Sequence, residues 1–118
     1  MGVTVLIVDD HATFRASARL LLESEGFDVI GEADDGEAAI EKSAQLAPDL
    51  VLLDVQLPDI DGFEVASRVT RAETAPMVIL ISSRDGRDFG ELVTSSGARG
   101  FVPKNELSGD VLRAYLDG

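Results

Sequence analysis

Five short runs of Val- and Ile-rich residues recur along the chain and constrain its fold more than any other feature. Each run has the length of a strand and is too dense in apolar residues to be half exposed, which is typical of parallel sheets buried on both faces. The runs span residues 3–8, 28–33, 50–54, 77–82 and 100–103. The pattern predicts an α/β domain with a flavodoxin-like, doubly wound, five-stranded parallel sheet, strand order 2-1-3-4-5 and helices on both faces.

Between these runs, apolar residues recur at helical spacing, as expected for crossover helices. The expected helix faces consist of Phe14, Ala18, Leu21 and Leu22; Ala38, Ala39, Ile40, Ala44 and Leu46; Phe63, Val65, Ala66 and Val69; Phe89, Leu92 and Val93; and Val111, Leu112, Tyr115 and Leu116. Gly26 and Pro48 should end the first two helices. Gly97 should end the fourth, and Ser108 should cap the fifth. Residues 82–92 are polar and glycine-rich, so we expect the fourth helix to be short or mobile.

Composition limits the classes of partner and the compartment. The 118 residues carry a formal net charge of −12 and no cysteine. A chain this acidic would repel nucleic-acid phosphates and anionic membranes, so we expect it to bind neither directly. No apolar run approaches the roughly 18 residues of a membrane span, and the N-terminus lacks a signal-peptide pattern. We therefore expect one cytoplasmic domain over residues 1–118, with no output domain in the chain.

Polar side chains gather where the predicted strands end. Asp9 and Asp10 follow the first strand, and Asp54 ends the third. Ser82 ends the fourth strand, and Lys104 follows the fifth. Because the carboxyl ends of parallel strands meet at one edge of the sheet, we expect these side chains to lie together. Carboxylates about 4 Å apart would repel by roughly 4 kcal/mol per pair at an effective dielectric of 20. A hard divalent cation with oxygen ligands removes that penalty, which favours Mg²⁺.

Such a cation site would give Asp54 a chemical role. A carboxylate that stays ionised beside a cation can act as a nucleophile toward a phosphoryl group. Lys104 would neutralise the transferring oxygens, and Ser82 would donate its hydroxyl to the attached group. Simpler readings stay open, because an acid pair after a strand is often a turn or a helix cap, and a lysine there is usually solvated. We interpret His11 as a helix-start residue that points past the acids, and not as a ligand.

Four motifs together resemble the receiver domain of two-component response regulators. They are VDD (8–10), LLDVQLPDIDG (52–62), LISS (80–83) and GARGFVPK (97–104). The resemblance spans essentially the whole chain. The stretch from Asp54 to Gly62 is similar to the family's D-x-x-[LM]-P-x-x-D-G loop, in which Pro58 and Gly62 shape the turn after the third strand.

The resemblance implies a role for each charged residue at the strand ends. Asp54 would be the phospho-acceptor, and Lys104 would bind the phosphate. Asp9, Asp10 and Asp54 would bind Mg²⁺, together with the backbone carbonyl of Gln56. The implied phosphoryl donor is a sensor histidine kinase. The domain would catalyse only its own phosphorylation and dephosphorylation, so it would not be an enzyme in the usual sense.

The resemblance also implies how a signal would leave the domain. Ser82 and Phe101 would be switch residues: Ser82 would move toward the phosphoryl group, and Phe101 into the space that it leaves. This would change the face made by the fourth helix, fifth strand and fifth helix, which would control an effector, transcriptional in the family's usual case, or pair two phosphorylated copies. Phe101 can equally be plain core, because GFV is also a typical buried strand.

Three stretches point to the NarL-type subgroup, whose receivers usually precede a helix-turn-helix DNA-binding domain. They are VDDH (8–11), GEADDGEAAI (31–40) and GARGFVPK (97–104). No such domain is present, so the chain either acts alone through protein–protein contacts or is the receiver part of a longer regulator. The chain departs from many receivers at Asn105, where they have Pro after the lysine. A cis Lys104–Asn105 bond would cost about 2.5–4 kcal/mol.

Three other functions stay open from the sequence. An aspartate-nucleophile phosphatase would resemble D-x-D-x-T, but Gln56 and Pro58 stand in the places of the second Asp and the Thr. A flavin-binding electron carrier needs an anion-binding loop after the first strand, where Asp9 and Asp10 would repel the cofactor phosphate. The third is a receiver-like interaction module that no longer takes phosphate.

Overall fold

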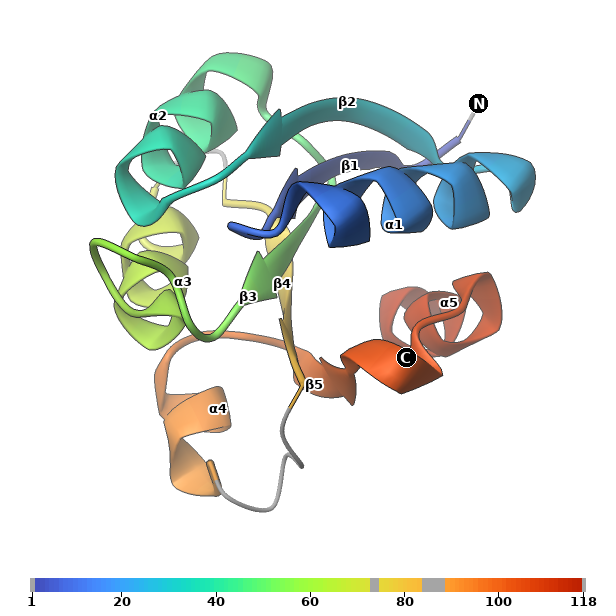
Figure 1. The fold of residues 1–118 in the computed structure, drawn as a ribbon. Coiled ribbons are helices and arrows are strands. Elements are labelled where there is room, and N and C mark those ends of the chain that lie inside the picture. The colour runs from blue at the N-terminus through green and yellow to red at the C-terminus, as the bar shows by residue number, and fades with distance from the viewer. Residues whose placement is uncertain (1, 73–74, 84–88, 118) are drawn as a thin grey trace.

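One parallel sheet organises the residues that the computed structural model describes, 2–72, 75–83 and 89–117. Its strands run in the order β2-β1-β3-β4-β5 (Figure 1). Their bounds are β1 Thr4–Val8, β2 Asp28–Ala33, β3 Leu50–Asp54, β4 Met77–Ser82 and β5 Gly100–Pro103. The predicted strands and their order are therefore confirmed, and only the start of β1 moves, by one residue.

Helices cover both faces of the sheet, also as predicted (Figure 1). They are α1 Ala12–Ser24, α2 Gly36–Leu46, α3 Gly62–Thr70, α4 Glu91–Ser95 and α5 Gly109–Asp117, with a 3-10 turn, η2, at Lys104–Glu106. α1 and α5 pack on one apolar cluster, and α2, α3 and α4 pack on the other. The fourth helix is short, as expected, and Phe89 lies ahead of it; residues 84–88 lie outside the described part of the chain.

Buried central strands give the sheet its rigidity. Because side chains of a strand alternate between its faces, Leu6 and Val8 of β1 enter the cluster under α2 and α3. Val5 and Ile7 enter the cluster under α1 and α5. All four side chains are fully buried, and each such burial stabilises the fold by about 1.5–3 kcal/mol. The residues that follow these strands therefore project from a fixed base.

Local signals end the helices where the sequence places them. Gly26 and Gly97 follow α1 and α4 with φ of 92° and 89°, a backbone conformation that glycine adopts at little cost. The hydroxyl of Ser108 accepts the N–H of Val111 at 3.1 Å and caps α5.

The core face of α2 differs from the prediction. Ala44 and Leu46 are exposed, whereas Ser43 is buried. Ala39 and Ser43 lie one turn apart and face the sheet, and residue 44 is turned about 100° further round the helix. The prediction used only the apolar residues of α2, so it placed Ala44 on the core face, where the structure has its neighbour Ser43.

The loop after β3 returns so closely to its strand that only glycine fits at the start of α3. The N–H of Gly62 donates to the carbonyl of Val55 at 2.8 Å. A Cβ at Gly62 would lie 2.7 Å from the Cα of Val55, and closer still to the carbonyl oxygen of Asp54. Both are backbone atoms and cannot rotate away.

We expect Gly62→Ala to lower the free energy of unfolding by about 1–3 kcal/mol, as overpacked positions do. Gly31→Ala is the matched control, because its Cβ would meet the tips of Leu46 and Leu6, and the 39% exposed Leu46 can move. Urea unfolding midpoints of the two variants measure the difference. Equal losses in both would contradict the assigned role of Gly62.

Candidate functional site

The register of the sheet brings the ends of four strands to one edge. Val8 lies opposite Leu53, so the next residue of each segment, Asp9 just after β1 and Asp54 at the end of β3, lie side by side. Ser82 lies opposite Pro103, which places Lys104 directly beyond them. The structure thus brings together the charged residues that the sequence expects at this edge.

Lys104 lies between two buried carboxylates. Its Nζ is 2.5 Å from Oδ2 of Asp9 and 3.3 Å from Oδ2 of Asp54. Both aspartates are almost fully buried, whereas 16% of the Lys104 side chain is exposed. The ammonium also lies over the ring of Phe14, 4.7 Å from its centroid, a favourable cation–π contact. Lys104 is therefore held at the acids from two sides.

Burial and the charges of neighbouring residues shift the pKa values of Asp54 and Lys104. The pKa of Asp54 is raised, first because burial disfavours its ionised form. The negative charge of Asp9 raises this pKa further. The Gln56 N–H, which donates to Oδ1 at 3.0 Å, and the Lys104 ammonium both favour the ionised form and lower the pKa, but they do not cancel the effect of burial. Burial alone would lower the pKa of Lys104, but its contact with Asp9 and the charge of Asp54 outweigh burial and raise it. One ammonium thus faces several carboxylates.

Asp9 depends on a cation at this site. The partner of its buried Oδ2 among the described residues is the Lys104 ammonium, 2.5 Å away, in an ion pair. A fully buried carboxylate oxygen without a hydrogen bond is costly unless a cation uses it. Asp10, with a 38% exposed side chain, adds oxygens at the rim. Ligand atoms of Asp9, Asp10, His11 and Asp54 all lie within 4.8 Å of one another. Oxygen donors at this spacing fit a hard cation such as Mg²⁺.

His11 only partly follows the prediction. It is the N-cap residue of α1, as a helix-start residue should be, and its side chain makes no cap hydrogen bond. Its ring, however, does not point past the acids. Nδ1 lies 3.1 Å from Oδ1 of both Asp9 and Asp10. The backbone N–H of His11 also donates to Oδ1 of Asp9 at 2.8 Å, which turns the residue back toward the pair.

Sequence reasoning missed Arg15 and Glu32. The Arg15 guanidinium donates to the carbonyl of Asp9 at 2.6 Å and to Glu32 at 3.0 Å. Glu32 also binds Arg19 at 2.7 Å, and this hydrogen bond, with the one from Arg15, holds the pKa of Glu32 below its usual range. These contacts fix the backbone of the acid pair. A signal was available, because Arg15 lies one helical turn after His11 and so shares its face.

Comparison with known proteins decides the family. Residues 5–116 match the family model of the response regulator receiver domain. The chain belongs to this family. None of the helices in the described part of this receiver is long and apolar enough to cross a bilayer.

Two curated relatives of this receiver are transcription regulators about twice its length. It is 39% identical to the transcriptional regulatory protein NarL of Mycobacterium tuberculosis over 116 residues, 98% of this chain and 54% of that protein. It is 38% identical to the virulence-factor transcription regulator BvgA of Bordetella pertussis over 110 residues, 93% of this chain and 53% of BvgA. The chain thus spans about half the length of these curated relatives, and the NarL-type resemblance is confirmed.

Solved structures agree with this relationship. The signal receiver domain of NarL from M. tuberculosis superposes with a TM-score of 0.88 at 38% identity, covering 98% of this chain and 94% of that one. A chain of the CheX–CheY–BeF₃–Mg²⁺ complex from Borrelia burgdorferi gives 0.82 at 30% identity, covering 98% and 87%. Receiver domains are signalling domains of two-component systems rather than enzymes of the usual kind; they bind Mg²⁺ at an acidic pocket and interact with histidine kinases.

The loop after β3 ties this receiver's acidic edge to two helices. The carboxylate of Asp59 accepts the N–H groups of Gly36 and Glu37, at 2.7 and 3.0 Å, at the start of α2. These bonds hold the pKa of Asp59 below its usual range. Asp61 caps α3 by accepting the N–H of Glu64 at 2.9 Å. The loop that carries Gln56 is therefore anchored at both helices.

The two expected switch residues occupy different environments. Ser82 is 1% exposed at the end of β4, while Phe101 in β5 is half-buried. The ring of Phe101 lies 5.4 Å from that of Phe89, which lies 5.5 Å from that of Phe63 in α3. A row of three aromatic rings thus links β5 to α3. All peptide bonds of the described residues are trans, the one after Lys104 included.

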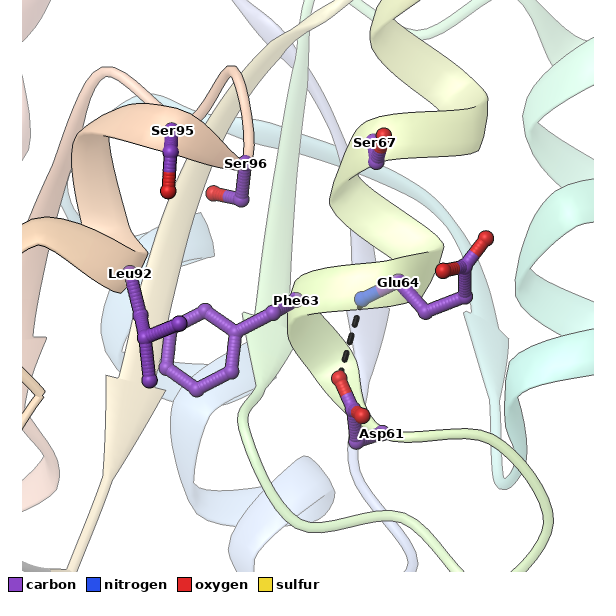
Figure 2. A pocket seen from close by; sticks show the side chains of 7 residues that line it. All are labelled: Asp61, Phe63, Glu64, Ser67, Leu92, Ser95 and Ser96. Carbon is purple, nitrogen blue, oxygen red and sulfur yellow. Dashed lines mark hydrogen bonds between the residues drawn. The ribbon is translucent and has the colours of Figure 1, made fainter.

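The row of rings ends at a hollow between α3 and α4. Figure 2 shows Phe63 projecting from α3 toward Leu92 of α4. The cavity measures about 220 Å³ and is lined by Asp61, Phe63, Glu64, Ser67, Leu92, Ser95 and Ser96. Neither the strand-end acids nor Lys104 lines it, so this hollow is separate from the receiver's acidic site.

We expect Asp54→Asn to become more stable relative to the unsubstituted protein as pH rises from about 4 to 7 in the absence of divalent cations. The raised pKa of Asp54 means that the folded state binds this proton more tightly than the unfolded chain. That stabilisation is complete below the ordinary pKa of 3.8 and is lost as pH rises through the folded-state pKa. Asparagine has no proton to lose.

Urea unfolding at several pH values, with EDTA present, measures this difference. Asp34→Asn controls for the loss of one charge, because Asp34 is exposed directly after β2. The raised pKa of Asp54 would be contradicted if the stability difference between Asp54→Asn and the unsubstituted protein did not change with pH.

Proposed function

We propose that this receiver accepts a phosphoryl group on Asp54 from a sensor histidine kinase, in a reaction that requires Mg²⁺. The observation that carries the proposal is the position of Lys104, whose ammonium reaches both Asp9 and Asp54 at the carboxyl edge of the sheet. A buried carboxylate beside a lysine and further acids is suited to phosphoryl transfer, which depends on positioning and charge neutralisation.

In the proposed site, Asp9, Asp10 and Asp54 hold Mg²⁺ together with the backbone carbonyl of Gln56. When bound, Mg²⁺ supplies the positive charge that neutralises the carboxylates and the phosphoryl oxygens. The Gln56 N–H fixes the orientation of the Asp54 carboxylate through its bond to Oδ1, and Lys104 lies at Oδ2. The nucleophile is thus oriented before its substrate arrives, which lowers the entropic part of the barrier.

The transfer step forms one bond and breaks another. A carboxylate oxygen of Asp54 attacks phosphorus, the P–O bond forms, and the P–N bond to the kinase histidine breaks. The electron pair of that bond leaves with the imidazole nitrogen. The Lys104 ammonium then pairs with a phosphoryl oxygen while it still neutralises Asp9.

The proposed output follows from the position of Ser82 at the end of β4. Its hydroxyl would donate to the phosphoryl group, and Phe101 would move with it and alter the α4–β5–α5 face. A shift from 1:99 to 99:1 between two states needs about 5.5 kcal/mol of differential interaction. Charge-assisted hydrogen bonds contribute about 1.5–3 kcal/mol each, so a few suffice. The ring contacts of Phe101 with Phe89 support movement of β5 and the segment before α4 together.

We further propose that the altered face controls a transcriptional effector or pairs two copies of this receiver. Its similarity to NarL and BvgA supports the transcriptional output. Action of the receiver alone, through protein–protein contacts, is the alternative for the output.

Incubation with acetyl phosphate should phosphorylate the protein only when Mg²⁺ is present, and Asp54→Asn should abolish the reaction. Mass spectrometry of the intact chain detects the added group. Asp34→Asn, which removes an exposed acid at the end of another strand, should react as the unsubstituted protein does. Phosphate on the Asp54→Asn variant would show that another residue is the acceptor.

Ser82→Ala should bind beryllofluoride in the presence of Mg²⁺ at least about tenfold more weakly, because one charge-assisted hydrogen bond is lost. Titration followed by amide NMR gives the dissociation constants. The variant should also show smaller shifts at Phe101 at saturation. Unchanged affinity and unchanged shifts would remove Ser82 from the proposed switch.

A further inference from the structure

Asp9 and Asp10 lie in the short turn between β1 and α1, where neighbouring carboxylates repel each other. β1 ends at Val8 and α1 begins at Ala12, so both acids lie outside these two elements. The backbone between two like charges turns to separate them unless other groups hold it. The contacts that hold this turn therefore decide how the two carboxylates are presented to a cation.

Two hydrogen bonds hold the backbone of Asp9, one at each of its polar groups. Its N–H donates to the carbonyl of Ala33, at the end of β2, at 3.0 Å. Its carbonyl accepts from Nη1 of Arg15 at 2.6 Å. That carbonyl belongs to the planar peptide unit that joins Asp9 to Asp10. The bond from Arg15 therefore fixes the plane from which the Asp10 side chain starts.

Glu32 holds Arg15 in the position that this contact requires. Nε of Arg15 donates to Oε1 of Glu32 at 3.0 Å while Nη1 reaches Asp9, so one guanidinium binds both residues. The pair is partly shielded from solvent, because 18% of the Arg15 side chain and 31% of the Glu32 side chain are exposed. A guanidinium carries its donors in a rigid planar fork, which suits such a two-point contact. Glu32 also balances the positive charge of Arg15, which would otherwise oppose a metal ion at the acids.

We propose that Arg15 is a positioning residue for the Mg²⁺ site: it orients the peptide between Asp9 and Asp10 and so raises the affinity of the acid pair for Mg²⁺. Glu32 acts through Arg15, because it holds the guanidinium in place. The inference rests on the proposed function, which assigns both acids to the metal. Partners that orient metal ligands typically change metal affinity by about 10–100-fold.

Arg19 offers a matched comparison within the same helix. It lies one turn after Arg15 and donates to the other carboxylate oxygen of Glu32 at 2.7 Å. Its guanidinium also donates to the carbonyl of Val29, in β2, at 3.2 Å. Arg19 therefore joins α1 to β2, whereas Arg15 makes this connection and reaches Asp9 as well. The two arginines should differ in their effect on Mg²⁺.

The binding test compares Arg15→Gln with Arg19→Gln, because glutamine has nearly the helix propensity of arginine and its amide nitrogen takes the place of Nε. Arg15→Gln can thus keep the bond to Glu32 while it loses the bond to Asp9. Its dissociation constant for Mg²⁺, measured by amide NMR titration, should rise at least about tenfold. Arg19→Gln should bind Mg²⁺ as the unsubstituted protein does.

Urea unfolding of the same variants should give the opposite order. Arg19→Gln loses its contacts with Glu32 and Val29, so it should be destabilised more than Arg15→Gln. A merely structural role of Arg15 would make Mg²⁺ affinity follow stability. Unchanged Mg²⁺ affinity in Arg15→Gln, or equal weakening in both variants, would overturn the inference.

Carbon-13 NMR of the Asp9 carbonyl checks the contact itself in the metal-free protein. A carbonyl signal moves upfield when the carbonyl loses a charge-assisted hydrogen bond. With EDTA present, the Asp9 signal should shift upfield in Arg15→Gln and stay in place in Arg19→Gln. An unshifted signal in Arg15→Gln would overturn the inference.

A double-mutant cycle tests whether Glu32 acts through Arg15. Glu32→Ala should weaken Mg²⁺ binding, because it releases the guanidinium. The double variant with Arg15→Gln should bind Mg²⁺ no more weakly than Arg15→Gln alone, since residues that act through each other have non-additive effects. Additive losses would show that Glu32 acts on the site independently and would overturn this part of the inference.

Phosphorylation by acetyl phosphate separates this inference from the proposed function. In Arg15→Gln, the Mg²⁺ concentration that gives half the maximal rate should rise at least about tenfold, while the rate at saturating Mg²⁺ stays close to that of the unsubstituted protein. Mg²⁺ binding without phosphorylation in the unsubstituted protein would contradict the proposed function and leave this inference standing. A lower rate at saturation with an unchanged half-maximal concentration would contradict the inference.

Discussion

An excess of negative charge at the carboxyl edge of the sheet is the constraint on which the rest of this structure depends. Asp9 and Asp54 are buried there, and Asp10 stands at the rim. A single ammonium, that of Lys104, reaches the two buried acids. Such an arrangement costs folding energy unless a cation joins it, and receiver domains bind Mg²⁺ at an acidic pocket of this kind.

The surrounding structure holds this costly edge in place. Fully buried strands fix where the acids project, and Arg15 clamps the carbonyl of Asp9 from α1. On the other side, Asp59 ties the loop after β3 to the start of α2, and Gly62 lets that loop return to its strand. The like-charged carboxylates of Asp9 and Asp54 are thus attached to separate rigid elements, which keep them together despite their repulsion, as preorganised sites require.

Much of the fold could be predicted because its signals are local and periodic. Dense Val and Ile runs indicate strands whatever surrounds them, and parallel topology then places Asp9, Asp54 and Lys104 at one edge. The direction of the His11 ring could not be predicted, because it depends on a backbone hydrogen bond to Asp9 at one turn. The predicted core face of α2 was wrong by about one residue, because Ala44 is apolar but small enough to lie exposed at little cost.

Carbon-13 NMR of the Asp54 carboxyl, titrated with pH in the absence and presence of Mg²⁺, tests most directly whether a shared cation relieves this charge. Without Mg²⁺ the pKa of Asp54 should lie above the ordinary value of an aspartate, because burial and Asp9 disfavour its ionised form. Saturating Mg²⁺ should lower it. A titration curve of Asp54 that Mg²⁺ leaves unchanged would contradict the central claim.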